Sequence, residues 1–166
     1  MNATVNTNRM QNNNLNEMEK PENRNVRILI LVVEDDKYMN ETLREVLEEE
    51  GYKVESSLTV QEAQEKIRYS EKKFNLLILD YNLQFLSGVT GLDIYLLAKE
   101  RNPAIQAIMI SAYGDKKIKE KAREKGISVF LDKPFKINEF TEAVNSISKK
   151  INHSASGNTN NFFYIN

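Results

Sequence analysis

Residues 27–36 read RILILVVEDD, an unbroken apolar run, rich in Ile and Val, that ends in three acidic side chains. A run of this kind is typical of a strand buried on both faces of a parallel sheet, because a strand with one wet face would alternate apolar and polar residues. The next segment places Met39, Leu43 and Leu47 on one helical face. The stretch therefore predicts a strand followed by a helix, with acidic groups at the carboxyl end of the strand.

The same strand–helix unit recurs along the chain. The predicted strands cover residues 27–33, 53–56, 75–79, 105–110 and 128–131, and the predicted helices cover 37–50, 59–70, 91–101, 114–125 and 137–151. Alternating buried strands and helices predict an α/β fold, a parallel sheet flanked by helices with right-handed crossovers. We expect a flavodoxin-like (βα)5 doubly wound sheet with strand order 2-1-3-4-5. Its ligands bind beyond the carboxyl ends of the first and third strands.

The composition changes at both ends of this region. Nine of residues 1–25 are Asn, and residues 152–166 contain no Asp, Glu, Lys or Arg. Segments with few apolar residues do not bury enough surface to offset the entropy lost on ordering. We therefore predict a disordered N-terminal segment at 1–25, one domain at 26–151 and a disordered C-terminal tail at 152–166. Neither end is long enough to form a further folded domain, which predicts a stand-alone domain.

The overall composition narrows the possible chemistry. The chain has 166 residues, no Cys, one His, a formal net charge of -1 and a pI of about 6.0. Without a basic surplus, direct DNA binding is not expected. Without Cys there is no thiolate nucleophile and no Cys-based metal site. No apolar run spans a bilayer, so we predict a cytoplasmic protein with no membrane contact.

Complementary polar groups stand where the predicted strands end. Glu34 and Asp35 follow the first strand, Asp80 the third, Ser111 the fourth and Lys133 the fifth. The carboxylates would converge and repel one another, which favours a hard cation such as Mg²⁺ with oxygen ligands. A carboxylate can also act as a nucleophile toward phosphorus. The lysine and the serine hydroxyl would then face the phosphoryl oxygens.

Each of these residues also has a purely structural interpretation. An Asp just before a helix is most often its N-cap, and Asp36 is assigned mainly to that role. Acidic groups are favourable at a helix N-terminus, and an Asp or Ser after a strand is common in turns. The functional interpretation depends on the combination of groups at four strand ends.

Four stretches together resemble the response regulator receiver domain of two-component signalling: residues 30–36, 77–83, 109–112 and 131–135. The resemblance covers residues 26 to about 151. It implies that Asp80 accepts a phosphoryl group from a phosphohistidine on a partner, either a sensor histidine kinase or a histidine phosphotransfer protein. The protein would be a signalling switch or phosphate relay rather than an enzyme that acts on other substrates.

The resemblance also implies a role for each site residue. Asp35 resembles the direct Mg²⁺ ligand and Glu34 the second acidic residue, with Asp80 and the backbone carbonyl of Asn82 completing the metal site. Lys133 resembles the phosphate-contacting lysine.

A second group of residues resembles the output switch of the family. Ser111 matches the hydroxyl position and Phe130 the aromatic position, while the peptide before Pro134 is expected to be cis. The output face would be the fourth helix, fifth strand and fifth helix, which bind a downstream protein.

The sequence departs from the family in places: Gln84 stands where Pro is common, and Phe130 lacks the hydroxyl of a tyrosine. The connection at residues 81–90 is longer than usual, so either Gly88 or Gly91 could be the family glycine, with Gly91 favoured. Two other protein classes compete with this interpretation. A Mg²⁺-dependent phosphohydrolase of the haloacid dehalogenase type is the alternative, but it needs Asp-x-Asp after its first strand. A flavodoxin needs a phosphate-binding loop that the acidic residues here would repel.

Overall fold

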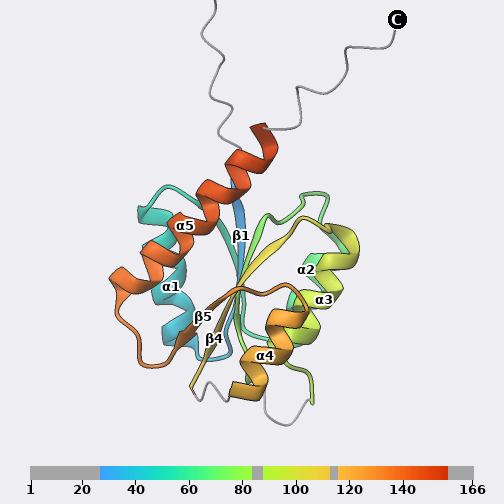
Figure 1. Ribbon diagram of the computed structural model, residues 1–166, viewed down its shortest axis with the longest axis vertical. Helices are drawn as coiled ribbons and strands as arrows, with labels where there is room; N and C mark the ends of the chain where they lie inside the picture. The colour runs from blue at the N-terminus through green and yellow to red at the C-terminus, as the bar shows by residue number, and fades with distance from the viewer. Residues whose placement is uncertain (1–26, 84–87, 113–115, 157–166) are drawn as a thin grey trace, which may run out of the picture.

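The computed structural model describes residues 27–83, 88–112 and 116–156, which form a five-stranded parallel sheet in the order β2-β1-β3-β4-β5. The strands are β1 (Leu29–Val33), β2 (Lys53–Ser57), β3 (Leu76–Asp80), β4 (Gln106–Ser111) and β5 (Val129–Asp132), and the helices are α1 (Lys37–Glu49), α2 (Val60–Tyr69), α3 (Gly91–Arg101), α4 (Lys116–Glu124) and α5 (Ile137–Ser156). The predicted fold class and strand order are confirmed. Figure 1 shows the sheet edge-on, with helices on both sides of it.

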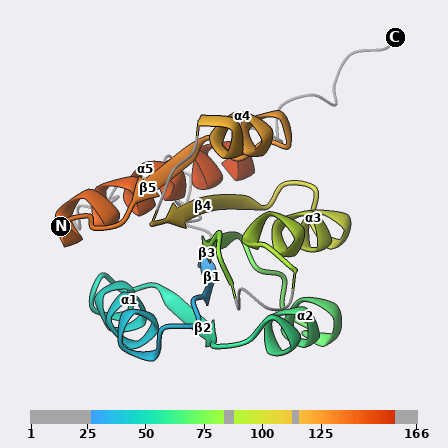
Figure 2. The same cartoon turned by 90° about the horizontal axis from the view of Figure 1, so that it is seen from below.

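Helices cover both faces of the sheet. Seen from the end of the sheet, α1 and α5 lie on one side, while α2, α3 and α4 lie on the other (Figure 2). Every residue of β1 and β3 is buried. Successive residues of β1 point to opposite sides, so Ile30 and Val32 pack in one apolar cluster and Leu31 and Val33 in the other. This double burial is why the strands read as continuous apolar runs.

Polar side chains at the helix starts satisfy backbone N–H groups. The Asp36 carboxylate accepts from the N–H of Met39 at 2.8 Å, which confirms Asp36 as the N-cap of α1. Thr59 Oγ1 accepts from the N–H of Glu62 at 3.1 Å, as the capping spacing predicted. The reciprocal bond differs, because Glu62 Oε2 accepts from the N–H of Leu58 rather than of Thr59.

The last helix corrects one predicted boundary. Helix α5 continues to Ser156, beyond the end predicted at Ile151. Once a helix is formed, each added residue gains a backbone hydrogen bond, so polar residues continue it without an apolar face. The Ser154 hydroxyl also donates to the carbonyl of Lys150 at 2.9 Å. Residues 152–156, predicted as the start of a disordered tail at 152–166, are therefore helical. The rest of that tail, the predicted segment at 1–25 and the predicted start of the fourth helix at Gly114 lie outside the described residues.

Within the described residues, no helix combines the length and the apolar character needed to cross a membrane.

Candidate functional site

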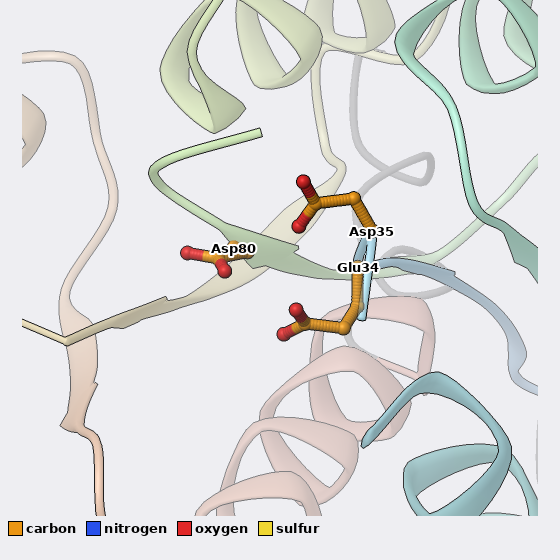
Figure 3. Close-up of side chains that lie close together, drawn as sticks. All are labelled: Glu34, Asp35 and Asp80. Carbon is orange, nitrogen blue, oxygen red and sulfur yellow. The ribbon is translucent and has the colours of Figure 1, made fainter. Parts of the chain in front are cut away.

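Three carboxylates meet at the carboxyl end of the sheet. Glu34 and Asp35 follow β1, and Asp80 is the last residue of β3; one oxygen of each lies within 4.8 Å of the others. The sheet register explains this meeting, because Val33 pairs with Leu79 and the next residue of each strand is therefore level with the other. Figure 3 shows the three side chains pointing toward a common space. The convergence predicted from the strand order is present.

The three carboxylates differ in their access to water. Glu34 is 1% exposed and Asp80 is 7% exposed, whereas Asp35 is exposed. The cluster is therefore closed toward the sheet and open on the side of Asp35. Oxygen-only ligands with one open side fit a hard cation that keeps part of its water shell, as Mg²⁺ does.

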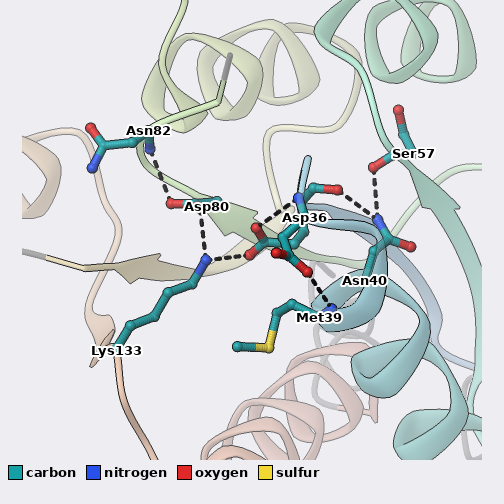
Figure 4. Close-up of polar contacts among 8 residues, drawn as sticks. Asp36, Met39, Asn40, Ser57, Asp80, Asn82 and Lys133 are labelled. Carbon is teal, nitrogen blue, oxygen red and sulfur yellow. Dashed lines mark hydrogen bonds and ion pairs between the residues drawn. The ribbon is translucent and has the colours of Figure 1, made fainter. Parts of the chain in front are cut away.

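Lys133 crosses from the end of β5 to this cluster. Its Nζ donates to Glu34 Oε2 at 2.6 Å and to Asp80 Oδ2 at 2.8 Å (Figure 4). Its backbone N–H donates to the carbonyl of Ser111 at 2.8 Å, which holds the start of the loop against β4. The peptide between Lys133 and Pro134 is cis, as expected. A single ammonium group therefore bridges two buried carboxylates.

Burial and neighbouring charges shift the pKa values of Glu34 and Lys133. Burial raises the pKa of the Glu34 carboxyl to about 7, and the charge of Asp80 also raises this pKa, whereas the hydrogen bond from Lys133 lowers it. Burial lowers the pKa of the Lys133 ammonium, but its hydrogen bonds to Asp80 and Glu34 outweigh burial and hold this pKa above its ordinary value. The cluster carries more negative than positive charge, so a bound cation would favour ionised Glu34.

The remaining oxygen of Asp80 is held by the chain that follows it. The N–H of Asn82 donates to Asp80 Oδ1 at 3.0 Å. The N–H of Tyr81 donates to the carbonyl of Ile110 at 2.8 Å, which extends the β3–β4 ladder past Asp80. Both oxygens of the Asp80 carboxylate thus have a defined donor, and the side chain is fixed in one orientation.

The two residues assigned to the switch lie on neighbouring strands. Ser111 is the buried last residue of β4, one position beyond the partner of Asp80. Phe130 lies in β5, is half-buried, and pairs with Met109 of β4. The guanidinium carbon of Arg123 in α4 lies 5.5 Å from the centre of the Phe130 ring. Phe130 therefore connects the end of the sheet to α4.

The structure favours Gly91 over Gly88 as the family glycine. Gly91 is buried, and a Cβ added there would overlap the backbone carbonyl of Asp80. A Cβ at Gly88 would meet nothing within 4 Å, although its φ of +68° favours glycine. The backbone at the start of α3 thus lies so close to the Asp80 carbonyl that only glycine, which has no Cβ, fits at position 91. Residues 84–87 of the longer connection lie outside the described residues.

The sequence reasoning missed one residue near the site. Asn40 lies in α1 and is 2% exposed, with its amide directed at the ends of β1 and β2 (Figure 4). A signal was present, because Asn40 stands three residues before Leu43 and seven before Leu47 and so belongs to the core-facing stripe. A polar residue on such a stripe indicates a buried hydrogen-bonding role.

Comparison with known proteins extends these observations. Residues 30–145 match the family model described as the response regulator receiver domain. The chain is 31% identical over 123 residues to the phosphate regulon transcriptional regulatory protein PhoB of Rhizobium meliloti, over 73% of this chain and 52% of that protein. It is 28% identical over 121 residues to the chemotaxis protein CheY of Thermotoga maritima, over 72% of this chain and 97% of that protein. The chain thus spans about half the length of the first relative and nearly all of the second.

A solved structure agrees with the fold. The CheY-like receiver domain protein of Methanospirillum hungatei superposes with a TM-score of 0.69 at 24% identity, over 76% of this chain and 98% of that one. These matches give no support to the haloacid dehalogenase alternative, and Glu-Asp-Asp follows β1 where that class needs Asp-x-Asp. The match of the family model over most of the chain, together with the carboxylate cluster at the predicted strand ends, shows that this chain belongs to the response regulator receiver domain family.

Proposed function

We propose that this receiver domain is a phosphorylation-controlled switch in which Asp80 accepts a phosphoryl group from a phosphohistidine on a partner protein. The observation that carries the proposal is the buried Asp80 carboxylate, which is oriented by Asn82 and bridged through Lys133 to Glu34. One carboxylate oxygen attacks phosphorus, the bond from phosphorus to the histidine nitrogen breaks, and its electron pair stays on the imidazole. The product is an aspartyl phosphate.

The acidic cluster fits a divalent cation. Glu34, Asp35 and Asp80, with the backbone carbonyl of Asn82, would hold Mg²⁺, which when bound neutralises charge on the transferring phosphoryl group. The Lys133 ammonium group, which now bridges Glu34 and Asp80, would instead contact the phosphoryl oxygens. The Ser111 hydroxyl would contact another phosphoryl oxygen from the end of β4.

The partners follow from this chemistry. The phosphoryl donor is a sensor histidine kinase or a histidine phosphotransfer protein, which places the reaction in the cytoplasm. The output is a change in protein binding at the face formed by α4, β5 and α5, or onward relay of the phosphoryl group. Direct DNA binding is not part of the proposal, because the chain carries a net charge of -1. The domain catalyses only its own phosphorylation and dephosphorylation.

Incubation with acetyl phosphate and Mg²⁺ tests the proposal. Intact-mass analysis should show one added phosphoryl group per chain, and chelation of Mg²⁺ with EDTA should prevent the addition. Continuous turnover of p-nitrophenyl phosphate without a stable phosphorylated species would contradict the switch and favour a phosphohydrolase.

Divalent cation binding is expected to depend on Asp35 and not on Asp36. Asp35 belongs to the carboxylate cluster, whereas the Asp36 side chain caps α1. Asp35→Ala should weaken Mg²⁺ binding by more than about tenfold. Removing a residue that only supports a metal ligand already costs about tenfold or more, and removing a ligand itself should cost more than that. Asp36→Ala should keep the affinity and lower the free energy of unfolding by about 0.5–2 kcal/mol through the lost cap. Calorimetric Mg²⁺ titration and urea unfolding of both variants measure the two effects. Equal losses of affinity would overturn this division of roles.

Helix α4 has the features of a movable element. Ala122 is its one buried residue among the described side chains. Its contacts to β5 include the ion pair between Lys119 and Asp132, at 2.7 Å, and the placement of Arg123 over the Phe130 ring. A helix with so thin an apolar face is held weakly, so a change at Phe130 can shift its position.

Phosphorylation is expected to change α4. When Ser111 moves toward the phosphoryl group, the Phe130 ring can turn inward, and its contact with Arg123 is lost. Beryllofluoride, a phosphoryl mimic, should therefore alter amide hydrogen exchange at residue 112 and over 116–131. Exchange over α1 residues distant from the site, such as Glu45–Glu49, should stay unchanged and serves as the internal control. If the altered exchange is confined to residues 81–83 and 88–91, this switch mechanism is wrong for this protein.

A further inference from the structure

The amide of Asn40 joins the ends of two strands beside the acidic cluster. Its Nδ2 donates to the carbonyl of Glu34 and to the carbonyl of Ser57, each at 2.9 Å. Ser57 is the last residue of β2, and its carbonyl also accepts from the N–H of Glu34 at 3.2 Å. Both N–H groups of the amide are therefore used, on a side chain that is 2% exposed (Figure 4).

The backbone of Asn40 makes a second contact with the same loop. Its N–H donates to the carbonyl of Asp36 at 2.9 Å, the first hydrogen bond of α1. The carbonyl of Glu34 precedes Asp35, and the carbonyl of Asp36 follows it. A single residue thus holds the chain on both sides of Asp35 without touching its carboxylate.

The two neighbouring carboxylates repel the carboxylate of Asp35. It is the exposed member of a cluster in which carboxylate oxygens lie within 4.8 Å of one another. Repulsion among carboxylates at this range favours turning the exposed one out into water. A restrained backbone limits that movement and keeps the oxygens arranged for a cation, so less order is lost on binding.

We propose that Asn40 is a positioning residue for the divalent cation site: its amide and backbone hold the loop from Glu34 to Asp36 so that Asp35 stays with Glu34 and Asp80. The proposal rests on the proposed function, in which these carboxylates bind Mg²⁺. Asn40 acts through the backbone and contacts neither the cation nor the phosphoryl group.

The chemistry of the site calls for an amide at this position. The amide supplies one N–H to the carbonyl of Glu34 and one to the carbonyl of Ser57, which it shares with the N–H of Glu34. An uncharged group also avoids adding to the negative charge nearby. Serine supplies one donor, alanine none, and aspartate would face both carbonyls with a negative charge. Asn40→Ser should therefore weaken Mg²⁺ binding less than Asn40→Ala does.

Calorimetric Mg²⁺ titration of the full chain tests the proposal directly. Asn40→Ala should raise the Kd for Mg²⁺ by about tenfold to a hundredfold, the usual effect of losing an outer-sphere partner, and Asn40→Ser should raise it less. The matched control is Asn145→Ala, because Asn145 also makes a side-chain bond, accepting from the Tyr52 hydroxyl at 2.6 Å, but between α5 and the other end of β2. It should leave the Kd unchanged even where the urea midpoint falls.

Labelling by acetyl phosphate gives a second readout. Asn40→Ala should label slowly at limiting Mg²⁺ and recover to within about twofold of the wild-type rate at saturating Mg²⁺, since the reacting groups are intact. A merely structural role would lower the urea midpoint of Asn40→Ala and leave the Kd within about twofold of wild type; that result overturns the proposal. If Asn40→Ala does not fold, an unchanged Kd for Asn40→Ser overturns it equally.

The same titration separates this inference from the proposed function. Wild-type protein that binds Mg²⁺ and labels at Asp80, with Asn40 variants of unchanged Kd, refutes only the role of Asn40. Wild-type protein that binds no Mg²⁺ refutes the cation site itself, and the role of Asn40 with it.

Discussion

Asp80→Asn is expected to abolish phosphoryl incorporation from acetyl phosphate. The amide is close in shape to the carboxylate, so its oxygen can still accept from the N–H of Asn82, which now reaches Asp80 Oδ1 at 3.0 Å. The amide is a far weaker nucleophile than the carboxylate, and the acyl phosphate cannot form. Because the charge of Asp80 raises the pKa of Glu34, that pKa should fall in the variant. The fold should be retained, which far-UV circular dichroism and urea unfolding measure.

The control for Asp80→Asn is the same change at the end of another strand of the sheet, β5. Asp132 closes β5, its side chain is 56% exposed, and it pairs with Lys119 outside the carboxylate cluster. Asp132→Asn should be labelled to the wild-type extent. Normal stoichiometry in Asp80→Asn, measured by intact mass, would show that the phosphoryl group is carried elsewhere.

Lys133→Met is expected to have the second largest effect. Its ammonium group is shared by two buried carboxylates, at 2.6 Å from Glu34 and 2.8 Å from Asp80. Loss of a donor that stabilises developing charge should slow labelling by about a hundredfold or more. Removing the ammonium group leaves two buried carboxylates without their positive partner. Without Mg²⁺, in the presence of EDTA, this loss should lower the free energy of unfolding by about 3–5 kcal/mol. Added Mg²⁺ should restore part of that stability, because a bound cation supplies the missing positive charge.

Lys136→Met provides the comparison for this variant. Lys136 is exposed, lies three residues farther along the chain, and contacts the start of α5 through its backbone N–H. It should change neither the labelling rate nor the unfolding midpoint beyond the small effects of surface substitutions. A Lys133→Met protein that is labelled as fast as Lys136→Met would exclude the proposed contact with the phosphoryl group.

Much of the architecture could be read from the chain because it depends on local patterns. Continuous apolar runs identify strands buried on two faces, and acidic residues at their carboxyl ends identify the site edge. The same patterns separated the two adjacent aspartates: Asp36 caps α1, while Asp35 joins the cluster with Asp80. These predictions succeeded because periodicity and helix capping involve residues close together in the sequence.

The contacts between distant segments required the tertiary structure. Periodicity did not indicate that Lys133 would bridge Glu34 as well as Asp80, that Asn40 would bind the carbonyls of Glu34 and Ser57, or that the Asp80 carbonyl would exclude a side chain at Gly91. The end of α5 at Ser156 was also missed, since a helix without an apolar face has no periodic signal. Local sequence patterns were enough to predict which elements form and which edge of the sheet carries the chemistry. Which atoms meet there was decided by packing, because each contact joins elements whose separation is set by the side chains between them.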